Sequence, residues 1–455
     1  MIYFIKCDIV KLINIILKRR KSSYFIETFL LKLKQMYKRK TIAEINEKIE
    51  KGEAVVFTAE EFKQIVRNEE PATVENVDVV TCATCAIMSG TAALLSIPVA
   101  ESGEFERADK VWLNNIPAFP GPCPNERLGI VDVFVYGTAR ANHEYGGGHL
   151  FREIVEGKQI EVKVKTNDRI IERKISKDDL QFARMITTRS AFKNYMAFVN
   201  PEEGEVGSIF SISGLKGPYK EITVTGSGEI NPLENDPLLK TIGIGTRIMV
   251  NGATGYVIGA GTRSSEEKPN LSVIADMHEM DAEFMGGFIT SKSPECITSI
   301  AVPVPVINEE VFSNLKIMDE QVKLPIAGIH DRIPFVESNY AAVWQNTDLE
   351  IQFDFDAHKC VQCDVCDVEK YCPTNAFSRS KGFDEHRCFN CGACVYLCTE
   401  GAFRGNLGRI KIHDKNVPIT LRQSNRSKAN ELAKKLKNQI KGKEFLLTEP
   451  VDYLR

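Results

Sequence analysis

Two matching runs of cysteine constrain this chain more than any other feature. Eight of its thirteen cysteines lie between Cys360 and Cys398. The first run is Cys360-x-x-Cys363-x-x-Cys366-x5-Cys372, and the second is Cys388-x-x-Cys391-x-x-Cys394-x3-Cys398. The triplets repeat at an offset of 28 residues, the difference between 360 and 388. Zinc sites usually combine two Cys-x-x-Cys pairs, whereas two triplets with trailing cysteines are typical of proteins that hold two 4Fe–4S clusters.

The spacing also predicts which cysteines share a cluster. A tight three-cysteine turn supplies three ligands, and in the two-cluster pattern the trailing cysteine of each run ligates the other cluster. The expected cluster-one set is Cys360, Cys363, Cys366 and Cys398, and the expected cluster-two set is Cys388, Cys391, Cys394 and Cys372. The first run has two extra residues before Cys372, and Thr399 stands where the pattern commonly has proline. We expect neither difference to abolish a cluster.

The remaining composition is that of an ordinary globular protein. Hydrophobic residues make up 43% of the chain and charged residues 26%, which excludes disorder as a global description. The net charge of −3, from 58 basic and 61 acidic residues, argues against nucleic acid as a partner. Clustered thiols without a secretory leader indicate a reducing compartment, so a cytoplasmic protein is expected.

The first 40 residues differ from the rest, since they hold eleven Lys or Arg against Asp8 and Glu27. Either they are a basic amphipathic extension, or translation starts at Met36 and the upstream residues are an artefact. Lys6 and Lys11 interrupt their apolar stretch, and the uncharged segment 79–100 contains many small polar residues. Neither segment therefore predicts a stable membrane span.

Local patterns predict a mixed α/β (α+β) large domain over residues 41–345. Helices are expected after the capping boxes Thr41-x-x-Glu44 and Thr58-x-x-Glu61. Further expected elements are strands over 77–81, 110–113 and 130–136, a short helix over 150–156, and a hairpin over 160–175. After residue 81 the small residues favour a turn followed by a helix. The VPVPV run at 302–306 predicts an extended segment outside the central strands, because proline lacks an N–H.

The C-terminal part is expected to form a small ferredoxin-like α+β iron–sulfur domain over 350–408. A tail over 409–455 follows, with a strand at 409–412 and a helix that Ser427 could cap. The inner stripe of that helix would be Leu432, Leu436 and Ile440, and it should pack against the large domain.

Several segments of the large domain resemble the homocysteine biosynthesis (HcyBio) family. The resembling segments are VWLN at 111–114, YGGGH at 145–149, NPLxNDPL at 231–238, TIGIGTRI at 241–248, GAxGYV at 252–257 and PVPVINE at 303–309. With the fused cysteine module, the chain is similar to the form of the family found in methanogenic archaea. One cysteine of the family falls near Met88–Gly90, where this chain has none, and another falls near Asn167–Ile171, where it also has none.

The resemblance implies a reductive sulfur transfer, in which sulfide is added to an aldehyde such as aspartate semialdehyde to give a thiol such as homocysteine. Reaching a thiol requires two electrons, which two clusters can supply. The implied partners are a small-molecule sulfur donor and acceptor and a redox protein, in methanogen sulfur or cofactor metabolism. The alternative is a non-catalytic electron carrier or an assembly factor for an enzyme of methanogenesis.

Candidate site residues in the large domain each have a structural alternative. Cys82 and Cys85 are either a sulfur-carrying or redox pair or two small buried side chains. Gly146, Gly147, Gly148 and His149 either bind an anion through backbone N–H groups or form a tight turn. Arg247, with Asp236, would bind an amino-acid-like substrate or form an ion pair. Cys123 is a possible third thiol, His143 a possible acid or base, and Cys296 is expected to be structural.

Overall fold

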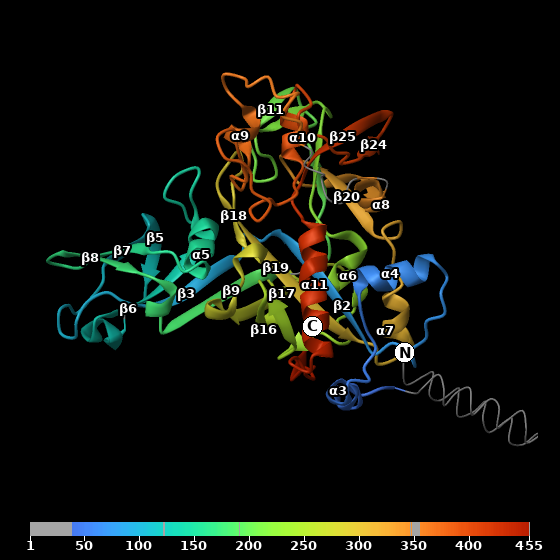
Figure 1. Ribbon diagram of the computed structural model, residues 1–455, viewed down its shortest axis with the longest axis horizontal. Helices are drawn as coiled ribbons and strands as arrows, with labels where there is room; N and C mark the ends of the chain where they lie inside the picture. The colour runs from blue at the N-terminus through green and yellow to red at the C-terminus, as the bar shows by residue number, and fades with distance from the viewer. Residues whose placement is uncertain (1–38, 122, 191, 346, 348–354, 455) are drawn as a thin grey trace, which may run out of the picture.

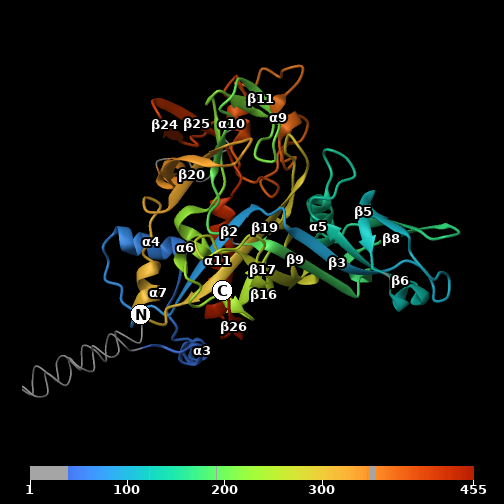
Figure 2. The same ribbon diagram turned by 180° about the vertical axis from the view of Figure 1, so that it is seen from behind.

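The computed structural model describes residues 39–121, 123–190, 192–345, 347 and 355–454. The predicted N-terminal extension, with Cys7 and Met36, lies outside these residues. The described chain is a mixed α/β structure, as expected, built on one large and one smaller sheet (Figure 1). The large sheet extends sideways, and the smaller sheet and the cysteine module form a lobe above its centre. The view from behind shows the same arrangement (Figure 2).

The large sheet has fourteen strands and holds most of the hydrophobic core. Its order is β1 (Val56–Thr58), β2 (Val79–Ile87), β19 (Glu295–Pro305), β15 (Arg247–Val250), β16 (Ala253–Ala260), β17 (Leu271–Asp276), β9 (Phe182–Ser190), β3 (Thr91–Pro98), β6 (Ile130–Tyr136), β5 (Ile116–Pro120), β4 (Lys110–Leu113), β7 (Ile160–Lys165) and β8 (Ile170–Ile175), with β18 (Gly286–Phe288) beside β19. The strands predicted at 110–113 and 130–136 and the hairpin over 160–175 are confirmed.

The prediction of a turn and helix after residue 81 was wrong. Residues 79–87 form the single long strand β2, a short turn follows at Met88–Gly90, and β3 begins at Thr91. β2 is buried on both faces over most of its length, so its small Ala, Thr and Cys side chains fit between packed layers. A fully buried strand lacks the alternating pattern that distinguishes a strand from a helix.

The prediction that the 302–306 segment avoids a central strand was also wrong. These residues end β19, which pairs with β2 from Ile297 to Pro305. On its other side β19 pairs with β15 only at Ile300 and Ala301. Beyond Ala301 that side has no ladder partner among the described strands, so the prolines are tolerated there.

Helices cover the sheet at the places where capping motifs predict them. α3 (Ile42–Lys51) and α4 (Ala59–Arg67) both begin at complete capping boxes, with Thr41 and Thr58 as N-caps. α5 is longer than expected, because it spans Gly147–Val155 and includes two of the glycines of the Gly-rich turn. The shorter helices are α6 (Pro232–Asn235), α7 (Glu309–Asn314) and α8 (Ala341–Trp344).

The smaller sheet joins the middle of the chain to its C-terminal tail. Its order is β21 (Pro334–Asn339), β20 (Lys323–Gly328), β10 (Ala197–Val199), β13 (Ile222–Val224), β25 (Lys415–Arg422) and β24 (Arg409–Ile412). The tail then continues into α11 (Arg426–Lys441), which packs against β2 and β19 with Leu432, Leu436 and Ile440 buried, as predicted. Its N-cap is Asn425 and not Ser427, since the Asn425 side chain accepts the Lys428 N–H.

The cysteine module sits at the top of the upper lobe in Figure 1. It contains two short helices, α9 (Asp367–Tyr371) and α10 (Ala393–Leu397), and the small hairpin β22 (Phe377–Ser378) and β23 (Gly382–Phe383). Its α10 contacts β25 of the smaller sheet. The module therefore rests on the body of the protein through a strand that belongs to the tail.

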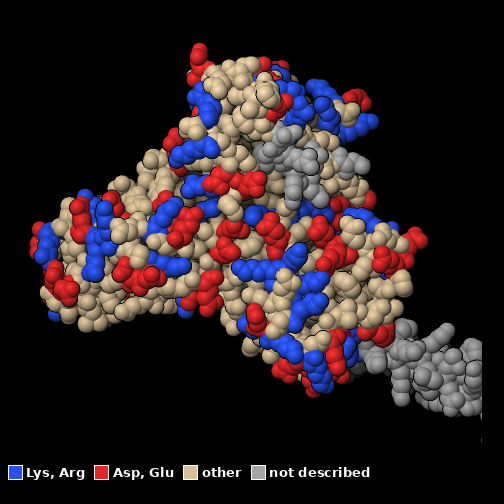
Figure 3. Space-filling view, viewed as in Figure 1, with Lys and Arg blue, Asp and Glu red and all other residues tan. Residues whose placement is uncertain are grey.

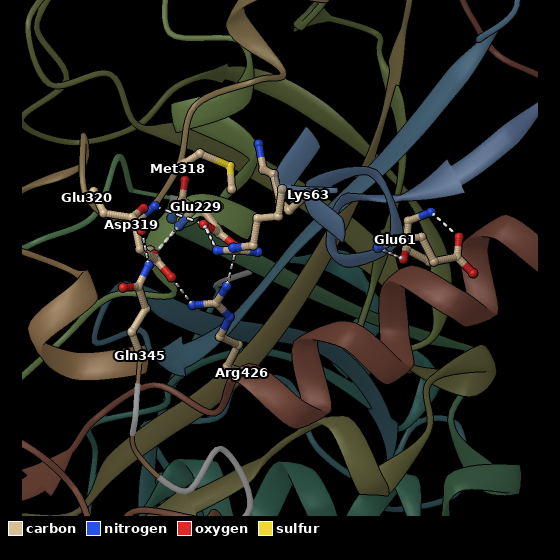
Figure 4. A network of polar contacts seen from close by, with 12 residues as sticks. Glu61, Lys63, Glu229, Met318, Asp319, Glu320, Gln345 and Arg426 are labelled. Atoms are coloured by element: carbon tan, nitrogen blue, oxygen red, sulfur yellow. Dashed lines mark hydrogen bonds and ion pairs between the residues drawn. The ribbon is translucent and has the colours of Figure 1, made fainter. Parts of the chain in front are cut away.

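A buried ionic network anchors the start of α11 (Figure 4). The Arg426 guanidinium donates to Asp319 at 2.6 Å and to Glu229 at 2.9 Å, and Arg67 of α4 donates to Glu229 at 2.7 Å. Both carboxylates are 1% exposed, so the network is shielded from water. Nearby, the buried Lys63 ammonium donates to Asn235 at 2.8 Å, and burial lowers its pKa to about 8.

The surface carries interspersed charges of both signs (Figure 3). Lys and Arg lie beside Asp and Glu over most of the face shown, in keeping with the small net charge. Among the described helices, none is both long and apolar enough to cross a membrane.

Candidate functional site

A pocket opens between the two sheets, where several strands end. Its wall comes from the end of β2 and the following turn, the end of β9, and the segments that follow β13, β16, β20 and β25. Its volume is about 870 Å³ including the open mouth. We call it the arginine pocket, because Arg189, Arg263 and Arg332 all line it.

The three arginines give this pocket its charge. Arg189 is half-buried at the end of β9, and Arg263 and Arg332 are exposed at the mouth on the connections after β16 and β20. Within the described residues, none of the three forms an ion pair with an acidic side chain, and no Asp or Glu lines the pocket. Three guanidinium groups on one small cavity favour a ligand with carboxylate or other oxyanion groups.

The backbone around this pocket is unusual as well. Arg263, Arg332 and Asn194 have φ angles of +65°, +58° and +25°, in the left-handed region that non-glycine residues seldom adopt. Such conformations persist where the surrounding structure enforces them, and they gather at functional sites. Three separate segments of the pocket wall therefore have this conformation, and two of them carry pocket arginines, which is typical of a functional site.

Aromatic side chains form the apolar part of the wall. Phe192 and Tyr195 meet edge to face with ring centroids 5.6 Å apart, and Phe210 lies 6.1 Å from Tyr195. Behind them, the Lys268 ammonium lies 4.6 Å from the Tyr195 ring centroid. Burial, and to a lesser extent the charge of Arg263, lowers the pKa of Lys268 to about 8. A fourth cation that titrates near neutral pH therefore stands directly behind the pocket.

The cluster-two set lines a second cavity, in the cysteine module. Cys372, Cys388, Cys391 and Cys394 all face it, although Cys372 is separated from the triplet in the chain. The rest of the lining is mainly apolar, with Phe377, Phe389 and Phe403 among its members. Four thiols around one apolar cavity are the donor set that a 4Fe–4S cluster requires.

Two opposing effects act on the pKa of Cys388, since a backbone hydrogen bond lowers it and burial raises it. The backbone N–H of Ala376 donates to Cys372 Sγ and that of Asn390 donates to Cys388 Sγ, both at 3.2 Å. Burial raises the pKa of Cys388 to about 12 and raises that of Cys391 well above its usual value. A buried thiolate needs positive charge beside it, which bound iron would supply.

The cluster-one set is arranged more openly. Cys360, Cys366 and Cys398 pack around the small core of Val368, Phe377, Ala402 and Phe403. Cys363 is exposed, and its neighbours Val361 and Val365 are 64% and 66% exposed. Arg379 donates to the Cys363 carbonyl at 2.6 Å and acts electrostatically on Cys360 and Cys366.

The described residues contain no group of three or more His, Cys, Asp or Glu placed closely enough to hold a single metal ion. A single ion draws its ligands within about 2.3 Å of itself. The four cysteines of the cluster-two set share one cavity instead.

One short path joins the cluster-two cavity to the arginine pocket. The N–H of Arg422 donates to the Cys391 carbonyl at 2.9 Å, and the next two residues, Gln423 and Ser424, line the arginine pocket. Phe389 of the cavity wall also contacts Phe288 of β18, with ring centroids 5.3 Å apart, and so packs the module against the large sheet. The cysteine module therefore lies directly behind one wall of the pocket.

Cys82 and Cys85 lie on β2, at 0% and 2% exposure. Residues three apart on a strand point to opposite faces, so the two thiols are not a facing pair. Burial raises the pKa of each to about 12. Neither lines the arginine pocket, although Thr84, Ala86 and Ile87 of the same strand do.

The Gly-rich turn uses its own backbone donors. The N–H groups of Gly147 and Gly148 donate to the carbonyls of Ala139 and Gly137, and that of Gly146 donates to His149 Nδ1. Gly147 and Gly148 are required sterically, since a Cβ at either would lie within 2.6 Å of a backbone oxygen. Burial lowers the pKa of His149 to about 4. The turn therefore seats α5 against β18 and β19 and has no free N–H among these three for an anion.

The remaining predicted residues lie elsewhere. Arg247 stacks on Phe445 at 4.4 Å, and Asp236 accepts the N–H groups of Lys240, Thr241 and Ile242. Cys123 donates to Asp132 at 3.0 Å, Cys296 is buried, and His143 is exposed. None of these side chains lines the arginine pocket. The expected substrate pair Arg247 and Asp236 is thus not brought together there.

Sequence reasoning missed the pocket arginines. Arg189 lies near the end of β9, Arg263 and Arg332 lie on two separate connections, and none of the three belongs to a motif. The one signal near the pocket was the family cysteine expected at Met88–Gly90, because Met88 and Ser89 line it.

Comparisons with known proteins agree with the resemblance seen in the sequence. The profile of the family described as "Homocysteine biosynthesis enzyme, sulfur-incorporation" matches residues 54–447, which include the cysteine module. An uncharacterized protein of Methanothermobacter thermautotrophicus is 44% identical, over 89% of this chain and 94% of its own length. An L-aspartate semialdehyde sulfurtransferase of Methanocaldococcus jannaschii is 32% identical, over 75% of this chain and 68% of its own length. A protein with the same name in Methanosarcina acetivorans is 29% identical, over 66% of this chain and 62% of its own length. No solved structure matches the chain.

Proposed function

Because the chain belongs to the homocysteine biosynthesis family, we propose that it is a reductive sulfurtransferase whose active site is the arginine pocket. The enzyme would add sulfide to a small aldehyde and reduce the product to a thiol. The observation that carries the proposal is the convergence of three arginines on a pocket that has no Asp or Glu in its described lining and that backs onto a four-cysteine cavity. The relatives named L-aspartate semialdehyde sulfurtransferase give the reaction class.

The pocket lining also suggests what kind of aldehyde is bound. An α-amino acid carries an ammonium group that usually pairs with an acidic side chain, and no Asp or Glu lines the described pocket. Arg189, Arg263 and Arg332 instead match oxyanions. We therefore propose a small aldehyde with a carboxylate, phosphate or sulfonate group and without an ammonium, which differs from the substrate named for the relatives.

The reaction balances as R–CHO + H₂S + 2 e⁻ + 2 H⁺ → R–CH₂–SH + H₂O. Two 4Fe–4S clusters, when bound, supply single electrons in sequence. The residues proposed to hold them are the cluster-one and cluster-two sets. The contact between the Cys391 carbonyl and the Arg422 N–H, followed by Gln423 at the pocket, supports delivery of electrons from the cluster-two side.

The sulfur can reach the aldehyde from a cysteine carrier or as free sulfide. The sequence predicts Cys82 and Cys85 as carriers, but both are buried and no described cysteine lines the pocket. We therefore propose that sulfide itself enters the pocket. Cys82→Ala and Cys85→Ala would then retain sulfide-dependent activity, whereas a carrier role requires one of them to lose it.

The test is a substrate panel under anaerobic conditions with iron-reconstituted protein, sulfide and dithionite. The panel contains two-carbon aldehydes with a carboxylate, a phosphate or a sulfonate, together with propionaldehyde and L-aspartate semialdehyde. We expect thiol formation from at least one ammonium-free oxyanion and little from propionaldehyde. Preference for L-aspartate semialdehyde would overturn the substrate class, and no thiol from any aldehyde would overturn the enzyme.

The exposed cluster-one loop supports a second candidate, an electron carrier that serves another enzyme. Val361, Cys363 and Val365 lie on the surface, where a redox protein can dock. The carrier would be favoured over the sulfurtransferase by two results together. The protein would capture a partner enzyme from native extract and lose it on Val361→Glu, and it would form no thiol.

A further inference from the structure

Glu295 is a buried carboxyl group that no structural role explains. It begins β19, where it pairs with Phe288 of β18, and it is 3% exposed. Its Oε2 atom has no hydrogen-bond partner among the described residues. Burying a polar group in this way costs free energy. A carboxyl in this state is often retained for its chemistry.

Glu295 lies directly behind the wall of the arginine pocket. The N–H of Met88 donates to the Cys296 carbonyl at 2.8 Å, which fixes the turn Met88–Gly90 beside the start of β19. The Ser89 side chain and the charge of Arg189 both act on the Glu295 carboxyl and lower its pKa, against the effect of burial. Both Ser89 and Arg189 line the pocket. The Ser89 hydroxyl is therefore the pocket group that can pass a proton between Glu295 and a bound ligand.

The pocket has few proton donors of its own. Its described lining contains no Asp, Glu, His, Lys or Cys side chain. The proposed reaction nevertheless needs two protons, and loss of water from the sulfide adduct requires a proton on the departing hydroxyl. A buried acid one hydroxyl away is placed to supply it.

We propose that Glu295 is the proton donor of the reaction in the arginine pocket, acting through the Ser89 hydroxyl; this rests on the proposed function. Hydrosulfide adds to the aldehyde carbon, and the resulting alkoxide takes one proton from solvent, so the adduct carries one hydroxyl and one thiol. Glu295 gives its proton to Ser89, and Ser89 gives its own to the adduct hydroxyl. Water then leaves as the C=S bond forms and the adduct thiol loses its proton to solvent. Two electrons from the reductant and two protons convert the C=S group to the thiol, and solvent reprotonates Glu295.

The surroundings shift the balance toward the protonated acid. Burial raises the pKa of Glu295, and the Ser89 hydrogen bond and Arg189 oppose this only in part. The groups that act on it are Arg189 from β9 and Ser89 from the turn after β2. The next residue of its own strand, Cys296, points to the opposite face of the sheet. Burial raises the pKa of that thiol to about 12, so it stays neutral.

The test compares Glu295→Gln, Glu295→Asp and the control Glu126→Gln. Glu126 is equally buried, at 3% exposure, but lies on the short 3-10 helix at Pro124–Leu128, where it accepts the Ala108 N–H. Infrared difference spectroscopy of the protein without substrate should show a carboxylic-acid band that Glu295→Gln removes and Glu126→Gln retains. This readout does not depend on turnover.

Glyoxylate, sulfide and dithionite then supply the kinetic readout. We expect kcat to fall about 100-fold or more in Glu295→Gln, within the range for general acids, with glyoxylate binding unchanged. Glu295→Asp should restore part of kcat and shift the alkaline side of the plot of kcat against pH. Loss of the band with unchanged kcat and pH profile in Glu295→Gln would overturn the inference and leave the proposed function standing. No turnover by the unaltered protein with glyoxylate or with any other aldehyde of the panel would instead overturn the proposed function.

Discussion

Arg189 is the pocket arginine that the fold holds most firmly. It ends β9, and its Nε approaches the β2–β3 turn so closely that a Cβ on Gly90 would lie 3.3 Å from it and 2.8 Å from Thr188 Oγ1. Arg263 and Arg332 lie further out, on exposed connections with positive φ. A ligand would therefore meet two outer guanidinium groups first and Arg189 at the inner end.

Arg189→Ala should weaken the binding of glyoxylate by about tenfold or more. A hydrogen bond to a charged group contributes about 1.5–3 kcal/mol, and each 1.4 kcal/mol is a factor of ten in Kd. Calorimetric titration of the reconstituted protein measures the change. Arg127→Ala, at an exposed surface ion pair with Glu106, is the matched control and should bind as the unaltered protein does. Equal affinity in both variants would remove Arg189 from the site.

Binding should also weaken as the pH rises from 7 to 9. Lys268 has a pKa of about 8, so it is mostly protonated below that pH and loses its charge above it. The loss removes a cation from behind the aromatic wall and disfavours an anion in the pocket. Glyoxylate Kd measured across this range should rise in the unaltered protein and stay flatter in Lys268→Arg. A rise that Lys268→Arg does not reduce would assign the pH dependence to another group.

At the scale of elements, α11 and the strand before it tie the C-terminal tail to both sheets. β25 pairs with β13 in the smaller sheet, and α11 then packs on β2 and β19 of the large one. The turn between them supplies Gln423 and Ser424 to the pocket. The tail is thus part of the site as well as of the core.

Arg426→Met should lower the free energy of unfolding by about 3–5 kcal/mol, the range for removing one partner of a buried ion pair. The change leaves Glu229 and Asp319 buried with Arg67 as their remaining arginine. Urea unfolding followed by circular dichroism measures it. Lys441→Ala, at the exposed end of the same helix, should change stability by less than about 0.5 kcal/mol. A similar small effect in Arg426→Met would show that the network is not a structural anchor.

The sequence predicts elements with local signals and fails where burial removes them. Complete capping boxes placed α3 and α4, and alternation placed the hairpin of β7 and β8. β2 was predicted wrongly because a strand buried on both faces shows no alternation. β19 was predicted wrongly because its prolines lie beyond the end of its pairing with β15, and the sequence does not show where that pairing ends. The pocket arginines could not be predicted at all, since only the tertiary fold brings their three segments together.

At the scale of the whole molecule, the two predicted cluster sets differ in their exposure to solvent. The cluster-one set includes the exposed Cys363, whereas the cluster-two set includes the buried Cys391 next to the arginine pocket. We expect a donor to reduce the cluster-one side first. Cytoplasmic localisation and a redox partner stay predictions that this arrangement accommodates.

Cys363→Ser and Cys391→Ser should separate the two sides. Each variant should lose about half of the bound iron and one of two electron paramagnetic resonance signals after reconstitution. Cys363→Ser should slow reduction by an external ferredoxin, and Cys391→Ser should slow reoxidation by aldehyde and sulfide. Equal effects of both variants on both steps would contradict the proposed order, and absence of iron in the unaltered protein would contradict the clusters.

In the proposed reaction, electrons held at the cysteine module reduce a substrate in the arginine pocket to a thiol. The most direct measurement is a single turnover of pre-reduced protein, freed of dithionite, with radiolabelled sulfide and an ammonium-free oxyanion aldehyde. We predict close to one labelled thiol for each chain, formed as the protein loses two electrons, and almost none in Arg189→Ala. Iron-loaded, fully reduced protein that keeps its electrons and yields no labelled thiol would contradict the account.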